Sequence, residues 1–571
     1  MHRLPIMYHF THQNKNQAMK RIFTIFCILM SLAQVFGQPS GVKNASKSVF
    51  TLTTFKADGS ILSSSHGVFL DNNGTAMSDW SSFEGASTAV VVDASGKRME
   101  VESIIGASEI YDVVKFRVKG KTTGINISTT AEAVGAPIYL VGYGLKKAEI
   151  KESKLTKVEH FMEKYAYYIF AMDIPENTLS CAVVNANGQL LGILQSSKYS
   201  TDLHSTSANY VADMQSEGLT GSDPTFRRTS IPIAIPDDKE QAVLALMLAS
   251  QSRDSLRYAK TIDLFIEKYP EQTEGYSTRA QTESNRNDFD AASRDMETAI
   301  KKASAKDDAH FAYARLIYQK EVYKPDVAYP NWSIDKALEE VHLASSINPL
   351  PIYRHLEAQI LYTKKEYQQA HDIFVDLTKS SIRNPELFYE AAQCKTMMEA
   401  PVEERLALID SAINLFSKPY TAEAAPYFIA RAGLLEMKGE YRKAVADYNQ
   451  YDTLMAGRLG VDFYYQREQC EVKARQFQQA IDDIDRATRM APREPLFWAE
   501  KGSLLLRVNK KEEALAAAEQ CVALDPEYSE GYLVKGLALI QLGKKKDGLA
   551  AFEKAKQLGS DQADALIAKY K

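Results

Sequence analysis

Two hydrophobic patterns follow one another along the chain. Up to about residue 215, short apolar runs alternate with turn signals, whereas from about residue 241 apolar residues recur at helical spacing in pairs of short segments. Short runs bounded by turns predict strands, and a recurrence every three to four residues predicts amphipathic helices. The sequence therefore predicts an all-β region followed by an all-α region.

The helical region has a period of 34 residues in its last three units. Tyr464, Trp498 and Tyr532 are spaced by this period, and Pro492 and Pro526 close two of the units. Small residues recur with it too, at Ala480, Ala514 and Gly548. Large residues can fill a helix pair, small ones let two helices approach, and a proline ends the second helix. This period is typical of helix–turn–helix repeats.

Residues 241–571 resemble the tetratricopeptide repeat family. Weaker copies of the pattern upstream raise the number of units to about eight or nine, followed by a closing helix over residues 561–571. The resemblance implies a superhelix with a concave groove that binds a peptide or protein segment. In that family the first helix of each pair contributes most of the groove. We therefore expect partner-binding residues near Gln466, Glu500 and Lys535.

The β region is predicted to hold short strands joined by tight turns. Asn72-Asn73-Gly74 and Asn185-Ala186-Asn187-Gly188 have the composition of hairpin turns. Residues 216–240 contain three prolines and two glycines, which predicts a semi-rigid linker to the helical region. The predicted strands are Val49–Phe55, Gly67–Asp71, Ala89–Asp93, Val113–Val118, Ile138–Tyr143, Tyr168–Met172 and Leu190–Gln195.

Residues 38–215 contain the segments Gly67–Ser78 and Asp112–Val118, and the order of these motifs resembles that of HtrA/Deg-type trypsin-like serine proteases. The stretch Gly67–Ser78 is similar to the two strands that precede the catalytic histidine in that family. Asp112–Val118 is similar to the strand that carries the triad acid, and Asp112 matches the acid itself. The resemblance implies a trypsin-like double barrel.

The residues at the other two triad positions differ from those of the family. The histidine position falls on Ser81, and the nucleophile position falls on Leu179 or, with a different gap, on Ser180. A serine nucleophile needs a general base, which Ser81 does not provide at neutral pH. The glycines that flank the family's nucleophile are also replaced. We therefore expect no catalytic residue in this domain and interpret it as a pseudoprotease.

Other nucleophile or base candidates have simpler interpretations. His66, His160 and His204 do not occupy the histidine position, and we interpret them as surface or turn residues. Cys181 would also need a base to form a thiolate, so burial as a small apolar residue is expected. The other cysteines are far apart and give no zinc or disulfide pattern. No motif indicates a cofactor or a metal.

The amino terminus predicts export. Lys20 and Arg21 precede an apolar run from Ile22 to Phe36, with a cleavage site after Gly37. We interpret residues 1–37 as a signal peptide whose translation starts at Met19, and expect a periplasmic, envelope or extracellular location. The net charge of −5 does not indicate the basic surface that nucleic-acid binding requires. No later segment is apolar enough to span a membrane.

These observations support one main hypothesis of function and one alternative. The main one is an exported scaffold whose repeats bind a partner protein or peptide beside an inactive trypsin-like domain. The alternative is an active trypsin-like endopeptidase that uses Ser180, with the repeats recruiting substrate. The absence of a histidine at Ser81 separates the two.

Overall fold

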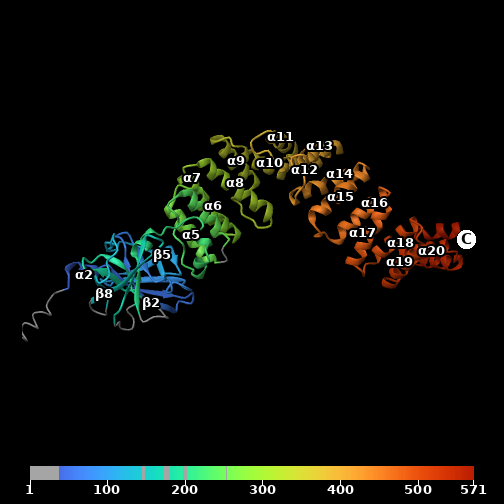
Figure 1. Ribbon diagram of the computed structural model, residues 1–571. Helices are drawn as coiled ribbons and strands as arrows, with labels where there is room; N and C mark the ends of the chain where they lie inside the picture. Colours follow the sequence, from blue (N-terminus) through green and yellow to red (C-terminus); the bar gives the residue numbers. More distant parts are fainter. Residues whose placement is uncertain (1–37, 144–147, 173–178, 197–201, 252–253) are drawn as a thin grey trace, which may run out of the picture. The chain divides into compact units, whose positions relative to one another are not determined.

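The structure is a computed structural model that describes residues 38–143, 148–172, 179–196, 202–251 and 254–571 (Figure 1). It forms two compact units, Met1–Ala305 and Lys306–Lys571. The predicted signal peptide, residues 1–37, lies outside the described residues.

The first six strands close into a barrel in the order β1-β2-β3-β6-β5-β4, with antiparallel pairing throughout. Buried residues alternate along β1, so that Phe50 and Leu52 point into the barrel. Phe50 packs there on Phe69, with ring centroids 4.6 Å apart. The strands are β1 (Val49–Phe55), β2 (Ile61–Phe69), β3 (Thr75–Ser78), β4 (Thr88–Asp93), β5 (Arg98–Ser108) and β6 (Val113–Val118).

The next seven strands form a second sheet in the order β11-β10-β7-β8-β9-β13-β12. Its two edge strands, β11 and β12, are separated along the chain by Leu194 alone, so the sheet curls until its edges nearly meet. The two barrel-like sheets confirm the predicted trypsin-like architecture. The strands are β7 (Pro137–Tyr143), β8 (Ala148–Phe161), β9 (Tyr165–Phe170), β10 (Ala182–Asn185), β11 (Leu190–Ile193), β12 (Gln195–Ser196) and β13 (Leu203–Thr206), with short helices α2 (Ser40–Ala45) and α3 (Ala208–Asp213) beside them.

Both predicted hairpin turns form, for a local chemical reason. Asp71 accepts backbone hydrogen bonds from Asn73 and Thr75 around the first turn. Asn185 does the same for Asn187 and Gln189 around the second. Such side-chain acceptors mimic a backbone turn and hold the strands in register.

The segment predicted as a linker, residues 216–240, is packed against the first barrel. Phe226 and Ile231 belong to the barrel core, and the ring of Phe226 lies 6.1 Å from that of Trp80. Ile104 of β5 exchanges backbone hydrogen bonds with Pro232 and Ala234, at 2.8 and 2.7 Å. This stretch therefore completes the barrel as well as connecting it to the helices.

The remaining described residues form antiparallel helix pairs, which succeed one another along the second unit (Figure 1). Ala480 and Ala514 are fully buried, and a Cβ added to Gly548 would come within 2.9 Å of the carbonyl oxygen of Gly536. The small residues of the 34-residue period therefore mark close helix contacts, as predicted.

After α2 and α3, the described α-helices of the first unit are α4 (Lys239–Ala249), α5 (Ser255–Lys268), α6 (Thr273–Asn285) and α7 (Phe289–Lys302). The helices of the second unit are α8 (Lys306–Tyr323), α9 (Ile334–Ile347), α10 (Pro351–Thr363), α11 (Tyr367–Leu377), α12 (Pro385–Met397), α13 (Val402–Ile413), α14 (Ala425–Met437), α15 (Tyr441–Met455), α16 (Val461–Lys473), α17 (Phe477–Met490), α18 (Pro495–Arg507), α19 (Lys511–Leu524), α20 (Ser529–Gln541), α21 (Lys545–Gln557) and the closing helix α22 (Ala563–Tyr570).

Candidate functional site

The structure places Ser81 directly against Asp112. Ser81 follows the end of β3 by three residues, and Asp112 immediately precedes β6. The backbone N–H of Ser81 donates to Asp112 Oδ1 at 2.7 Å, and the Ser81 hydroxyl lies 3.2 Å from Asp112 Oδ2. The two positions aligned with the triad histidine and acid therefore meet in space.

Asp79 occupies the centre of this site, and sequence reasoning did not single it out. Its carboxylate is buried, with 7% of the residue exposed. Oδ1 accepts from the hydroxyls of Ser180 at 2.6 Å and Ser78 at 3.1 Å. Oδ2 accepts from the hydroxyl of Ser81 at 3.1 Å and the backbone N–H of Ser82 at 2.9 Å. Four donors thus surround one carboxylate.

Of the two alternatives for the nucleophile position, Ser180 is the one in the site. Its backbone has a left-handed conformation, with φ of 67°, and its N–H donates to the carbonyl of Leu194 at 2.8 Å. Only 3% of Ser180 is exposed. Leu179 instead has 44% of its surface exposed to solvent. The residues before it, 173–178, lie outside the described part of the chain.

The side chains form a chain of contacts, Ser180 to Asp79 to Ser81 to Asp112. In a Ser-His-Asp triad an imidazole joins the serine to the acid and takes its proton. Here the Asp79 carboxylate and the Ser81 hydroxyl lie between Ser180 and Asp112 instead. A carboxylate is a much weaker base than an imidazole, and four donors lie within hydrogen-bond distance of this one. Burial raises the pKa of Asp112, partly offset by the hydrogen bonds from Ser81.

His66 lies beside the site, which differs from its interpretation as an ordinary surface or turn residue. It is on β2, and its imidazole hydrogen-bonds to the backbone of Leu179 while Nδ1 is buried without a partner. Burial lowers the pKa of His66. His160 is exposed on β8, and His204 on β13 stacks on Tyr167 at 5.2 Å.

Cys181 is a buried thiol, as expected. Only 1% of it is exposed, and burial raises its pKa to about 12. A thiol with so high a pKa is not a nucleophile at neutral pH. The three other described cysteines, Cys394, Cys470 and Cys521, are fully buried as well.

The three groove residues predicted in the repeats have different surroundings. Gln466 on α16 is exposed and donates to the hydroxyl of Tyr448 on α15 at 2.9 Å. Lys535 on α20 lies 3.5 Å from Glu519 on α19. Glu500 on α18 is half-buried, and burial raises its pKa. Two of the three thus contact the second helix of the preceding unit.

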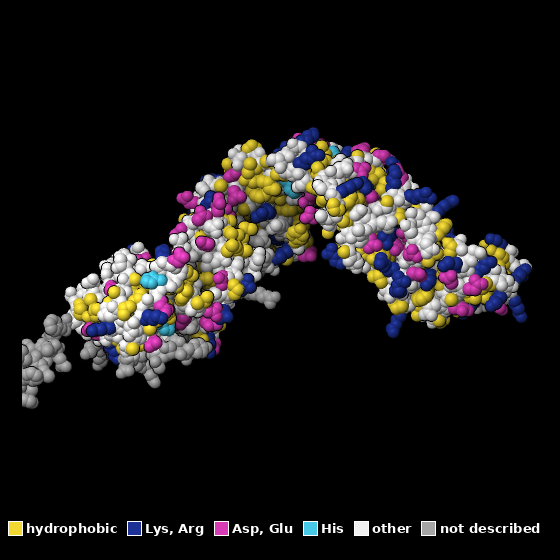
Figure 2. Space-filling view, viewed as in Figure 1, with side chains coloured by type: hydrophobic (Ala, Val, Ile, Leu, Met, Phe, Trp, Pro, Cys, Tyr) yellow, Lys and Arg dark blue, Asp and Glu magenta, His cyan; other side chains and the backbone are white. Residues whose placement is uncertain are grey.

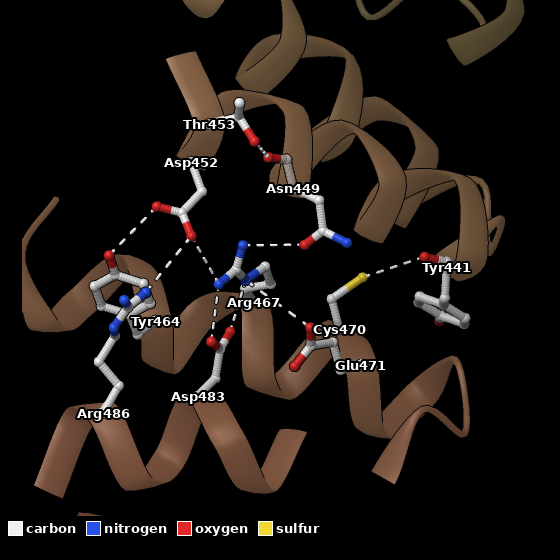
Figure 3. Close-up of polar contacts among 10 residues, drawn as sticks. All are labelled: Tyr441, Asn449, Asp452, Thr453, Tyr464, Arg467, Cys470, Glu471, Asp483 and Arg486. Carbon is white, nitrogen blue, oxygen red and sulfur yellow. Dashed lines mark hydrogen bonds and ion pairs between the residues drawn. The ribbon is translucent and has the colours of Figure 1, made fainter. Parts of the chain in front are cut away.

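A buried arginine joins two consecutive units close to these residues (Figure 3). Arg467 on α16 donates to both oxygens of Asp483 on α17, at 2.6 and 2.8 Å. It also reaches back to α15, with Asp452 at 3.0 Å and Asn449 at 3.0 Å. Its planar guanidinium carries several N–H donors and can therefore bond to groups on α15 and α17 at once.

The same arrangement recurs in two earlier units. Arg279 and Arg431 each pair in the same bidentate way with the aspartate 16 residues further on, Asp295 and Asp447. Each also contacts an aspartate of the preceding helix, Asp263 or Asp410. An Arg–Asp spacing of 16 residues, repeated three times, is the sequence signal that could have revealed this contact.

Two glutamates of α16 are buried next to Arg467. Glu468 is 0% exposed and Glu471 is 2% exposed, and one oxygen of each has no hydrogen-bond partner. Burial raises the pKa of Glu468 to about 7 and that of Glu471 to about 8. Glu468 occupies the repeat position of Gly502 and Gly536. A glutamate at a position that is glycine in the next two units could have pointed to this buried carboxyl group from the sequence alone.

The described residues include neither a candidate metal cluster nor a candidate membrane span. No group of three or more His, Cys, Asp or Glu side chains there could hold a metal ion. None of the helices in that part of the chain is long and apolar enough to cross a bilayer.

Comparison with known proteins matches the last part of the helical region to a repeat family. The tetratricopeptide repeat family model matches residues 471–520 and 499–563, from within α16 to the first residue of α22. Comparison with curated proteins gives no match. Among solved structures, the chain is similar to the active form of the Rv3671c protease from M. tuberculosis, with 14% identity over 31% of this chain and 82% of that chain, and a TM-score of 0.27.

Proposed function

We propose that this protein is an exported interaction scaffold, in which the tetratricopeptide repeats bind a segment of a partner protein and the trypsin-like domain does not hydrolyse peptides. The repeat match and the succession of helix pairs support partner binding. The observation that carries the proposal is the hydrogen bond from Ser180 to Asp79, in a site without a histidine between serine and acid.

The chemistry of that bond argues against an acyl-enzyme mechanism. Ser180 would have to lose its proton to a base as it attacks a carbonyl carbon. Its hydroxyl donates instead to the Asp79 carboxylate, which has three other donors within hydrogen-bond distance. The burial of Ser180 adds a steric obstacle. We expect the domain to bind a peptide or to serve as a platform for the repeats.

The test of inactivity uses the purified full chain, a fluorophosphonate probe and casein. We expect neither labelling nor turnover above the level of a Ser180→Ala variant. Labelling that disappears in Ser180→Ala would establish the alternative, an active endopeptidase.

The test of partner binding uses the chain as bait in a cell-envelope extract, followed by titration of each captured protein. Reversing the charges of Glu500 and Lys535 together should weaken binding without changing the melting temperature. Binding that depends only on residues 43–215 would move the partner site to the β domain. Export is tested by sequencing the amino terminus of the protein from cells, which should begin at Gln38.

A further inference from the structure

A cavity of about 980 Å³ lies between the first barrel and the helices that follow it. It is bounded by residues of β3, β5 and β6 on one side, and by the stretch after α3, the segment before α4 and helix α5 on the other. All of these elements belong to the first compact unit. Its volume is typical of pockets for small ligands. Among the described residues, its lining shares none with the Ser180–Asp79 site.

Arg117 of β6 borders this cavity and is open to solvent. Side chains alternate along a strand, and Phe116 and Val118 of β6 belong to the barrel core, so Arg117 lies on the outer face of the barrel. It is exposed and lines the cavity. Within the described residues its guanidinium makes no hydrogen bond or ion pair. A ligand in the cavity can therefore reach it.

A second unpaired donor lies beside Arg117. Ser103 of β5 is its direct partner in the antiparallel register, which places the two Cβ atoms about 5 Å apart. Ser103 also lines the cavity, with 2% of the residue exposed. Its hydroxyl has no hydrogen-bond partner in the described part of the chain. Burying an unpaired hydroxyl costs free energy, which an anionic group held by Arg117 would offset by accepting from it.

The other two cations of the lining are engaged by the protein itself. Lys115 Nζ donates to two backbone carbonyls at the end of α3, at 2.6 and 2.8 Å. Lys268 Nζ pairs with Asp237 at 2.5 Å and donates to the carbonyl of Ile235 at 2.6 Å. Of the three basic residues in the lining, Arg117 is thus the one available to an anionic group.

Carboxyl groups outnumber the cations of the lining by six to three. Three of the six have structural partners, in the hairpin turn after β2, in the ion pair with Lys268 and at the start of α4. The other three make no side-chain hydrogen bond or ion pair within the described residues. They are Glu102, Glu217 and Glu267. A multiply charged anion is disfavoured among so many carboxylates, whereas an ammonium group would find partners there.

Recognition in this cavity has to be local. On the face of the first unit that Figure 2 shows, positive and negative side chains are interspersed, so no broad field of one sign covers that face. A ligand is therefore selected by where its own charges lie. It needs one anionic group for Arg117 and a cationic group for the unpaired glutamates, and a zwitterion has both.

We propose that this cavity binds a short peptide as a zwitterion, with its terminal carboxylate on Arg117 and Ser103 and its terminal ammonium toward the unpaired glutamates. A guanidinium can hold a carboxylate through two parallel N–H···O bonds. Apolar lining residues such as Ile105, Ile127 and Leu264 would contact the side chains of the peptide. The inference concerns the first unit alone and does not depend on partner binding by the repeats.

The test is isothermal titration calorimetry of the purified full chain with trialanine. The comparison probes are trialanine amide, which lacks the carboxylate, and N-acetyl-trialanine, which lacks the ammonium. We expect each of these to bind at least about tenfold more weakly, because each loses one charge that the cavity pairs. Inorganic phosphate should not compete with trialanine.

Two variants localise the carboxylate end. Arg117→Gln should remove the preference for trialanine over its amide, and Ser103→Ala should reduce it. The control is Arg98→Gln, which removes an exposed arginine of β5 that is not part of the lining and should leave the preference unchanged. Melting temperatures of all three variants show whether the fold is kept.

The contrary outcomes are definite. No heat of binding from trialanine, or equal binding of trialanine and its amide, would overturn the inference without any variant. Displacement of trialanine by phosphate would show a general anion site and overturn the assignment of a zwitterion. An equal loss in Arg117→Gln and Arg98→Gln would do the same for the role of Arg117. A failed search for a partner of the repeats affects the scaffold proposal and none of these results.

Discussion

The hydroxyl of Ser180 donates a 2.6 Å hydrogen bond to the carboxylate of Asp79, across 101 residues of sequence. The bond joins the turn after β3 to the segment before β10, and so ties one β-sheet to the other. Because both residues are buried, it has the character of an internal structural contact. The residue at the nucleophile position is thus tied into the fold.

Ser180→Ala should therefore destabilise the protein by about 1–2 kcal/mol, the usual loss when a buried group bonded to a carboxylate is removed. The matched control is Ser95→Ala. Ser95 donates to Asp93 at the same 2.6 Å, but in an exposed turn, so its loss should cost less than about 0.5 kcal/mol. Thermal denaturation followed by circular dichroism measures both. Equal effects would contradict a structural role for the Ser180–Asp79 bond.

Phe226→Ala should destabilise the β domain by about 3–4 kcal/mol, because the ring is 5% exposed and leaves a cavity beside Trp80. Leu219→Ala, at a residue with 63% exposure in the same segment, is the control and should be nearly neutral. A fragment of residues 38–220 should accordingly be degraded by protease faster than one of residues 38–238. A stable shorter fragment would show that residues 221–238 are dispensable.

Arg467→Met should cost about 3–5 kcal/mol, because it leaves Asp483 and Asp452 without their buried cation. Lys501→Met removes a more exposed pair with Asp485 and should cost about 1 kcal/mol or less. Urea denaturation of both variants provides the comparison. Similar costs would mean that the buried arginine adds nothing beyond an ordinary surface ion pair.

The repeats should lose stability as the pH rises from about 4.5 to about 8. Burial raises the pKa of Glu471 to about 8 and those of Glu468 and Glu283 to about 7, above the value of 4.5 for a free glutamate. Over this interval the folded state holds protons that the unfolded state has released, so the free energy of unfolding falls with pH.

Charges on two helices take part in the titration of Glu471: Asp482 and Asp483 on α17, and Arg467 and Glu468 on α16. Glu471→Gln should reduce the pH dependence and stabilise the protein at pH 8 by roughly 1–2 kcal/mol. Urea midpoints at pH 5, 6, 7 and 8 provide the measurement, with the exposed Glu513→Gln as control. An unchanged slope in Glu471→Gln would contradict the assignment.

Local patterns in the sequence were enough to predict much of the β region. The predicted strand Val113–Val118 coincides with β6, and Val49–Phe55 coincides with β1, because buried residues recur in a short run between turns. Two long strands were not predicted. Only Leu155 is buried in β8, and β5 carries two register shifts, so neither shows a clean alternation.

The sequence by itself determined the 34-residue repeat, the change from β to α structure and the loss of the histidine at Ser81, because each depends on residue type and spacing along the chain. The tertiary structure decided which residues contact one another. Asp79 meets Ser180, and Phe226 enters the barrel core, only because strands distant in sequence pack together. Oε1 of Glu468 lacks a hydrogen-bond partner for the same reason: whether a carboxyl oxygen meets a donor depends on the facing helices, which a linear pattern does not specify.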